Sequence, residues 1–179
     1  PSVTINLTAQ SPVLCYGGKD GSVRLSIVPN GYTYFDFDYK LINTATNSTV
    51  ATGKINPYTS QSTPFYITGL SAGTYNVVIS NPINFCTYTS SKVTVTQPNA
   101  PLSMSSCREV SPVSSTTAAD GVGQVVVSGG TPTYRLSIVR PNGTTFTVPS
   151  QTLGTFNLTG LAPGTYNVTA YDLAYSKGV

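Results

Sequence analysis

The chain has 179 residues, a formal net charge of +3 and only 8% charged residues, while 39% of its residues are hydrophobic. Disordered chains combine high net charge with low hydrophobicity, so this composition excludes a disordered segment. The basic residues never cluster, which argues against nucleic acid as a partner. No apolar run approaches the roughly 18 residues of a membrane-spanning helix, so we expect no membrane span.

The side chains that common catalytic mechanisms need are missing from the sequence. There is no histidine, and Glu109 is the single glutamate. Without histidine, a serine or cysteine nucleophile lacks its usual base. Asp36 and Asp38 are one strand repeat apart, and we expect them on a solvent-facing surface rather than as a catalytic pair. The sequence therefore predicts a protein that is not an enzyme and that uses no cofactor.

The sequence also offers little to a metal ion. The three cysteines, Cys15, Cys86 and Cys107, have no close-spaced partner of the kind that zinc sites use. Calcium needs several oxygen ligands, commonly from clustered aspartates. Asp20 and Asp120 each precede a glycine, which is typical of turn residues. We therefore predict no metal site.

Alternating apolar and polar residues, the period of a half-buried strand, mark the first half of the chain. In chain order, the alternating segments are residues 22–27, 35–41, 75–79 and 93–95. Turn-forming glycine, proline and asparagine residues separate them. No stretch of about ten residues has the apolar spacing of an amphipathic helix.

The second half repeats this order, with alternating segments at residues 125–127, 134–138, 156–158 and 166–170. The phrase L-S-A-G-T-Y-N-V at residues 70–77 returns as L-A-P-G-T-Y-N-V at residues 161–168, a spacing of 91 (161 − 70). This period matches one small β-domain. We predict an all-β fold of two tandem immunoglobulin-like β-sandwich modules, residues 1–97 and 98–179.

The repeated phrase is similar to a tyrosine corner, in which a tyrosine hydroxyl turns back onto backbone a few residues upstream. The tyrosines at this position are Tyr75 and Tyr166. We predict that both are structural residues. Each hydroxyl would satisfy a buried backbone group that otherwise costs about 1–3 kcal/mol.

An ordered set of short motifs resembles the SprB-type repeat, which occurs in tandem in large secreted adhesins of gliding and related bacteria. The motifs are Cys15, D-G-S-V at residues 20–23, G-G-T-P-x-Y at residues 129–134, the repeated phrase, Cys86 and V-T-V-x-Q-P at residues 93–98. The first module lacks the G-G-T-P phrase, and the second lacks the second cysteine. The resemblance implies a secreted structural or adhesive module, and it implies no catalytic residue.

The odd number of cysteines suggests a thiol that pairs outside the chain. Cys15 precedes the strand at residues 22–27 and Cys86 follows the strand at residues 75–79, and these strands are expected to run in the same direction. The two cysteines would then lie about 20 Å apart, whereas a disulfide needs Cα atoms within roughly 7 Å. We expect Cys86 and Cys107 to bond between neighbouring copies. A Cys15–Cys86 bridge remains open if the first strand doubles back.

N-x-S/T sequons mark candidate attachment sites for covalent glycans, provided that the source cell glycosylates them. There are five, at Asn6, Asn47, Asn142, Asn157 and Asn167. Asn157 and Asn167 are expected to point outward because their neighbours Phe156 and Val168 point inward. Glycans would also help to keep a surface with so few charges in solution.

The N-terminal segment has the alternation of the strand at residues 93–95; it comprises Val3, Thr4, Ile5, Asn6 and Leu7. Counted from the cysteines, the two segments are in phase, because 15 − 3 equals 107 − 95. The second module shows no counterpart of residues 93–95. We predict that the N-terminal segment completes the second module of an adjacent copy, either by strand donation or as part of a continuous tandem chain. Both arrangements give a head-to-tail polymer.

These observations favour a subunit or segment of an extracellular filament or cell-surface adhesin, whose partners are copies of itself. The alternative is a carbohydrate-binding accessory module of a secreted protein, in which exposed tyrosines stack on sugar rings. The candidate loop tyrosines for that function are Tyr32, Tyr58, Tyr88 and Tyr175.

Overall fold

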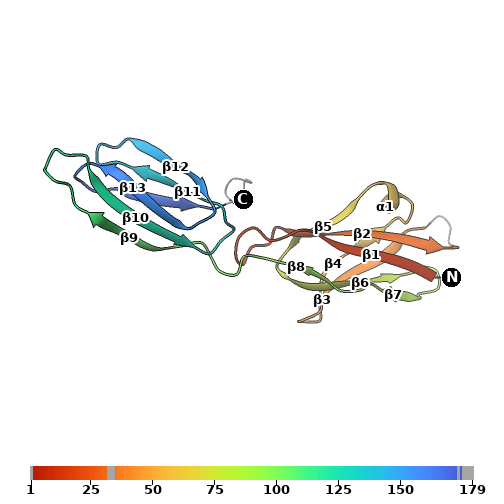
Figure 1. Cartoon of the computed structure of the whole chain (residues 1–179). Helices are drawn as coiled ribbons and strands as arrows, with labels where there is room; N and C mark the ends of the chain where they lie inside the picture. The colour runs from red at the N-terminus through yellow and green to blue at the C-terminus, as the bar shows by residue number, and fades with distance from the viewer. Residues whose placement is uncertain (1, 32–34, 173, 175–179) are drawn as a thin grey trace. The chain divides into compact units, whose positions relative to one another are not determined.

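The computed structural model describes residues 2–31, 35–172 and 174. It is an all-β structure of two compact units, divided between Gln97 and Pro98, except that residues 14–16 group with the second unit. Each unit contains two β-sheets of antiparallel strands (Figure 1). The predicted fold class, two tandem β-sandwich modules, is confirmed.

The first module packs a three-stranded sheet against a larger one. The smaller sheet has the order β1 (Ser2–Ser11), β2 (Gly21–Asn30), β5 (Phe65–Leu70). The larger has the order β4 (Ser48–Ile55), β3 (Phe37–Asn43), β6 (Gly73–Ser80), β7 (Thr87–Thr89), and β8 (Val93–Val95) also pairs with β6. A single helical turn, α1 (Thr59–Ser62), lies between β4 and β5.

Alternation builds the core of this module. Val23, Leu25 and Ile27 of β2 are fully buried, and so are Leu41 of β3 and Val77 of β6. Because successive side chains of a strand point to opposite faces, one apolar set from each sheet meets in the interior.

The described residues of the second module repeat this plan with fewer strands. One sheet has the order β13 (Thr155–Leu161), β10 (Gly121–Ser128), β9 (Ser103–Ser111). The other has the order β12 (Thr145–Gln151), β11 (Tyr134–Val139), β14 (Asn167–Tyr171). Its core contains Val125, Leu136, Ile138 and Phe156.

Strand register shows which residues of the two modules are equivalent. Leu7 of β1 pairs with Leu25 of β2, and Cys107 of β9 pairs with Val125 of β10. Leu7 and Cys107 therefore occupy the same place, 100 residues apart (107 − 7). The count from the cysteines, which made Cys15 the equivalent of Cys107, is therefore wrong. Strand register is set by backbone pairing and by which face of the strand is buried. The spacing between cysteines gives no information on either.

The N-terminal segment, which we predicted to complete the second module of an adjacent copy, lies in its own module in this structure. Val3, Ile5 and Leu7 belong to β1, which pairs with β2 of the same module, and they pack on its core. The remaining members of the segment, Thr4 and Asn6, face outward from the same strand. The segment is taken up by its own module because β2 offers a long backbone edge beside an apolar core that the segment covers.

In the described residues of the second module, no strand occupies the edge that β7 and β8 form in the first. In the first module, Gly73, Thr74 and Tyr75 of β6 pair with β8. Their equivalents, residues 164–166, precede β14 and belong to no strand. Within the described residues, no strand corresponding to β7 or β8 follows β14.

Candidate functional site

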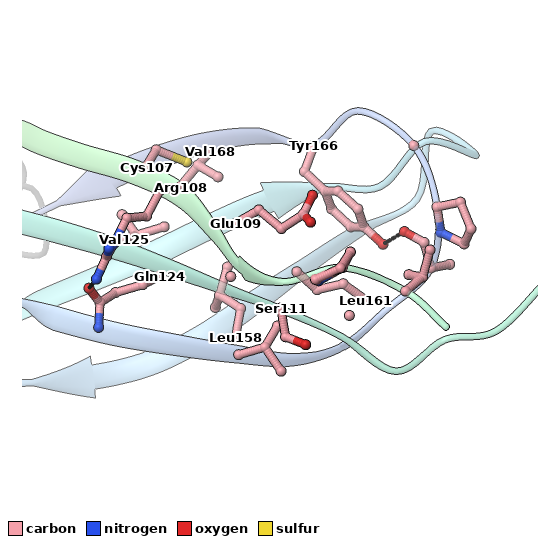
Figure 2. Close-up of a pocket in the computed structure, with 18 residues that line it drawn as sticks. Cys107, Arg108, Glu109, Ser111, Gln124, Val125, Leu158, Leu161, Tyr166 and Val168 are labelled. Atoms are coloured by element: carbon pink, nitrogen blue, oxygen red, sulfur yellow. Dashed lines mark hydrogen bonds between the residues drawn. The ribbon is translucent and has the colours of Figure 1, made fainter. Parts of the chain in front are cut away.

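A groove opens on the second module beside β9, β10 and the segment that leads into β14. Its volume is about 410 Å³. Apolar side chains line much of it, namely Val113, Val125, Leu158, Leu161, Tyr166 and Val168. Cys107 and Glu109 line it from β9, and Figure 2 shows both beside the apolar residues.

The groove lies where the first module holds β8. There, Val95 is 1% exposed, and the backbone N–H of Val13 donates a 2.8 Å hydrogen bond to the carbonyl oxygen of Thr96. A Cβ placed on Gly21 would lie 2.6 Å from Val95 Cγ1, so the strand packs directly on this glycine. At the equivalent Gly121, the nearest atoms belong to Val113 and Leu161.

Residues around the groove are more exposed than their equivalents in the first module. At five of these positions the first module has a buried residue, namely Leu7, Val13, Leu70, Tyr75 and Val77. Their equivalents are half-buried or exposed; they are Cys107, Val113, Leu161, Tyr166 and Val168. An apolar surface of this kind, on a strand edge, is a typical place for another polypeptide to bind.

The polar rim of the groove carries two opposite charges. Arg108 donates a 3.0 Å hydrogen bond from Nη2 to Gln124 Oε1 (Figure 2). Glu109 makes no ion pair among the described residues. The rim therefore presents one carboxylate that is not neutralised by a neighbouring cation.

Both tyrosines of the repeated phrase make the hydrogen bond expected of a tyrosine corner. Tyr75 Oη donates to the carbonyl oxygen of Ser71 at 2.8 Å, and Tyr166 Oη donates to that of Ala162 at 3.1 Å. Burial raises the pKa of the Tyr75 hydroxyl. Tyr75 is 2% exposed, whereas Tyr166 is only half-buried because nothing in the described chain covers it as β8 covers Tyr75.

None of the three cysteines forms a disulfide within the chain, and all three are exposed. Cys15 lies before β2, and Cys86 lies in the loop after β6. Cys107 lies within β9. Bonding of Cys86 to Cys107 between copies stays a prediction.

The acidic residues that could serve as catalytic residues or metal ligands make local contacts at the surface. Asp38 forms a 2.8 Å salt bridge with Lys54, which raises the pKa of Lys54, and Asp36 accepts a 2.8 Å hydrogen bond from Asn56. Hydrogen bonds from the hydroxyl and backbone N–H of Ser114 lower the pKa of Asp120. Across the described ranges, no three histidine, cysteine, aspartate or glutamate side chains gather as a metal site.

All five sequon asparagines, Asn6, Asn47, Asn142, Asn157 and Asn167, are exposed. Asn157 accepts a 3.1 Å hydrogen bond from Gln124 Nε2 on the outer face of the β10–β13 pair. Asn142 Oδ1 accepts hydrogen bonds from the N–H and the hydroxyl of Thr144 in the β11–β12 turn. Their exposure leaves every sequon accessible to a glycan.

Two of the four tyrosines that are candidates for sugar binding lie within the described residues. Tyr58 is 48% exposed next to α1, and Tyr88 is half-buried in β7. Tyr32 and Tyr175 lie outside the described residues.

The structure explains why the G-G-T-P phrase has glycine at residues 129 and 130, which the sequence alone did not predict. Gly129 and Gly130 have φ values of 73° and 58°, and a Cβ on Gly129 would collide with the carbonyl oxygen of Pro101. Asp172, 9% exposed, accepts a 2.8 Å hydrogen bond from the N–H of Thr131. The phrase therefore forms a tight backbone turn that packs against Asp172.

No helix in the described residues is both long enough and apolar enough to cross a membrane. A two-domain fibronectin type III segment from chicken tenascin is similar over 92% of this chain and 87% of its own, at 16% identity and a TM-score of 0.37. The BSP domain of a biofilm-associated protein is similar over 94% and 27% of the two chains, at 17% identity and a TM-score of 0.33.

A bacterial ice-binding adhesin of 1.5 MDa is similar over 88% of this chain and 54% of its own, at 15% identity and a TM-score of 0.41. This chain thus spans about a quarter of the biofilm-associated protein structure and about half of the adhesin structure. No model of a known family matches the chain, and no curated protein sequence matches it. At these identities and TM-scores, the similarities carry no argument about what the chain binds.

Proposed function

We propose that this chain is a non-catalytic structural segment of an extracellular filament or a bacterial cell-surface adhesin, and that its modules associate head to tail. The apolar groove of the second module is the observation that carries the proposal. Five residues that are buried in the first module have half-buried or exposed equivalents around this groove. A self-associating segment needs a surface of this kind at one place and a matching element on its neighbour.

The composition supports an extracellular location. Charged residues are 8% of the chain, and five exposed sequons offer sites for covalent glycans. The SprB-type motif order supports a secreted repeat, and the G-G-T-P and tyrosine-corner phrases both serve the fold of one module. These features suit a tandem array whose units differ in detail and share a scaffold.

The rival function is carbohydrate binding. It needs several exposed aromatic rings on one surface, and Tyr58 is the strongest candidate in the described chain at 48% exposure. A glycan-array screen of the chain tests it directly. Binding to a defined sugar, lost on Tyr58→Ala, would replace the structural proposal.

Sedimentation velocity over a range of protein concentrations tests head-to-tail association. The variant Cys107→Trp fills the groove with an indole, and Val110→Trp places the same indole on the same strand outside it, where Val110 is 52% exposed. We expect concentration-dependent association of the native chain and of Val110→Trp, with association lost in Cys107→Trp. Measurements with reductant remove any contribution from disulfides.

Electron microscopy of material from the source cells gives the second test. Filaments that react with an antibody to this chain are the expected result. A chain that stays monomeric at every concentration, together with source material that has no labelled filaments or surface fibres, would overturn the proposal.

A further inference from the structure

We propose that the outer face of the sheet β1-β2-β5 binds an acidic sugar, a uronate unit of an oligosaccharide, through the guanidinium of Arg24 and the ring of Tyr66. The inference concerns the first module alone and does not depend on head-to-tail association. It differs from the stacking of sugars on loop tyrosines, because one cation and one ring on neighbouring strands carry it.

Arg24 is the single charged residue on the three strands of this sheet. β1, β2 and β5 contain no aspartate, glutamate or lysine and no other arginine. Val23 and Leu25, on either side of Arg24, are fully buried, so Arg24 points to the opposite, outer face. Among the described residues, no carboxylate forms an ion pair with it. The outer face therefore carries a positive charge that its own strands do not neutralise.

The guanidinium of Arg24 also has hydrogen-bonding capacity that the fold does not use. The side chain is half-buried, and its Nε is shielded from solvent without a hydrogen-bond partner in the described chain. Polar atoms in such positions normally have a partner, so an orphaned donor indicates that one is missing. Nε is the one shielded atom of this group, so the Nη end stays accessible to a ligand. A planar carboxylate accepts two parallel hydrogen bonds from a guanidinium.

The equivalent row of the second module shows what a self-sufficient face looks like. Gln124 takes the place of Arg24, because each pairs with both neighbouring strands in the same register. Arg108 donates to Gln124 at 3.0 Å, and Gln124 donates to Asn157 at 3.1 Å. The polar groups of that row therefore satisfy one another, whereas the row in the first module leaves its cation without a partner.

The neighbours of Arg24 suit a sugar better than a simple anion. Tyr66 of β5 pairs with Arg24 and is 45% exposed, and Thr8 of β1 pairs with it from the other side. The next pair along the face, Asn6 and Ser26, adds an amide and a hydroxyl for sugar hydroxyl groups. A neutral sugar would leave the cation unpaired, and a free carboxylate would leave the ring uncovered. A uronate uses both.

Trigalacturonate is the probe, and its methyl ester, which has no charge, is the matched control ligand. The full chain, expressed without N-linked glycans so that Asn6 is free, is titrated with each while backbone amide shifts are recorded. We expect trigalacturonate to shift the amides of residues 6–8, 24–26 and 66–68, and the ester to leave them unchanged. Binding should weaken when ionic strength rises from about 0.01 to 0.15 M, because the exposed end of the pair is screened.

Arg24→Gln gives this position the residue that the second module has at Gln124, and it should weaken binding at least roughly tenfold. Tyr66→Ala should weaken it several-fold. Lys40→Gln removes the same charge from an exposed position on the other sheet of the first module and should bind as the native chain does. The amide spectrum outside the site shows whether each variant is folded.

No shift at these residues with about 10 mM trigalacturonate would overturn the inference. Equal binding of the methyl ester, or full binding by Arg24→Gln, would do so as well. A sulfated galactose trisaccharide that binds as tightly as trigalacturonate would exclude a site built for a carboxylate.

Sedimentation velocity separates this inference from the proposed function. Arg24→Gln should associate as the native chain does while it loses the sugar. A native chain that stays monomeric and binds trigalacturonate would leave this inference standing and remove head-to-tail assembly, and a chain that associates without binding the sugar would do the reverse.

Discussion

Leu7 and Cys107 hold the same place in the two modules, and they differ in burial. Leu7 is 7% exposed and packs on the core, whereas Cys107 is exposed beside the groove. Their partners across the strand pair, Leu25 and Val125, are both buried. The difference therefore comes from the side of the strand away from this partner, where β8 contacts β1 and no described strand takes the place of β8 beside β9.

The first prediction concerns these two residues. We expect Leu7→Ala to destabilise the first module by about 2–3 kcal/mol, because it removes buried apolar atoms and leaves a cavity. Cys107→Ala should change the stability of the second module by less than about 0.5 kcal/mol, as exposed substitutions do. Urea denaturation, followed by amide signals from each module, measures both. Equal effects would contradict the difference in burial.

The second prediction separates the two tyrosine corners. Tyr75→Phe should destabilise its module by about 1–2 kcal/mol, since the carbonyl oxygen of Ser71 loses its partner next to a buried ring. Tyr166→Phe should have an effect below about 0.5 kcal/mol, because water can reach the carbonyl oxygen of exposed Ala162. Urea midpoints for each module provide the measurement. A larger shift of the urea midpoint for Tyr166→Phe would show that the Tyr166 corner contributes more to stability than the Tyr75 corner does.

The third prediction tests the G-G-T-P turn. Gly129→Ala combines a left-handed backbone with a collision at the carbonyl oxygen of Pro101, and we expect the second module to lose more than about 3 kcal/mol. Gly143→Ala is the matched control, since Gly143 has a φ of 82° and open space around it. It should lose only about 1–2 kcal/mol. Thermal unfolding of the two variants compares them, and equal midpoints would rule out the collision.

The fourth prediction concerns the sequons. Expression in a cell that attaches N-linked glycans should give a chain heavier than its sequence mass, and glycosidase treatment should restore that mass. Asn157→Gln removes a sequon on an outward strand position and should remove one glycan. Intact-mass spectrometry measures the change. A chain without added mass in such a cell would show that exposure alone does not lead to modification.

The fifth prediction concerns a disulfide between Cys86 of one copy and Cys107 of the next. If copies are joined through Cys86 and Cys107, non-reducing peptide mapping of oxidised chain should recover a Cys86–Cys107 cross-link and no Cys15–Cys86 peptide. Cys15 precedes β2 and Cys86 follows β6, and neither forms a disulfide within the chain. Recovery of the Cys15–Cys86 peptide alone would exclude the hypothesis.

The sequence by itself determined the strands that have one buried face. Val23, Leu25 and Ile27 alternate with polar residues, and this alternation is local information that survives in the fold as β2. The repeated phrase likewise located both tyrosine corners, because the hydroxyl and its acceptor are only four residues apart.

Only the tertiary structure decided the rest. β4 and β9 are mostly exposed strands, so their sequences carry no apolar alternation, and sequence reasoning missed both. The equivalence of Leu7 with Cys107, and the place of residues 3–7 in their own module, depend on pairing with β2 and β10. The groove exists because an edge strand covers one module and no described strand covers the other. The register of a strand pair and the burial of a strand edge depend on contacts between segments that are far apart in the chain. A local sequence pattern therefore does not predict them.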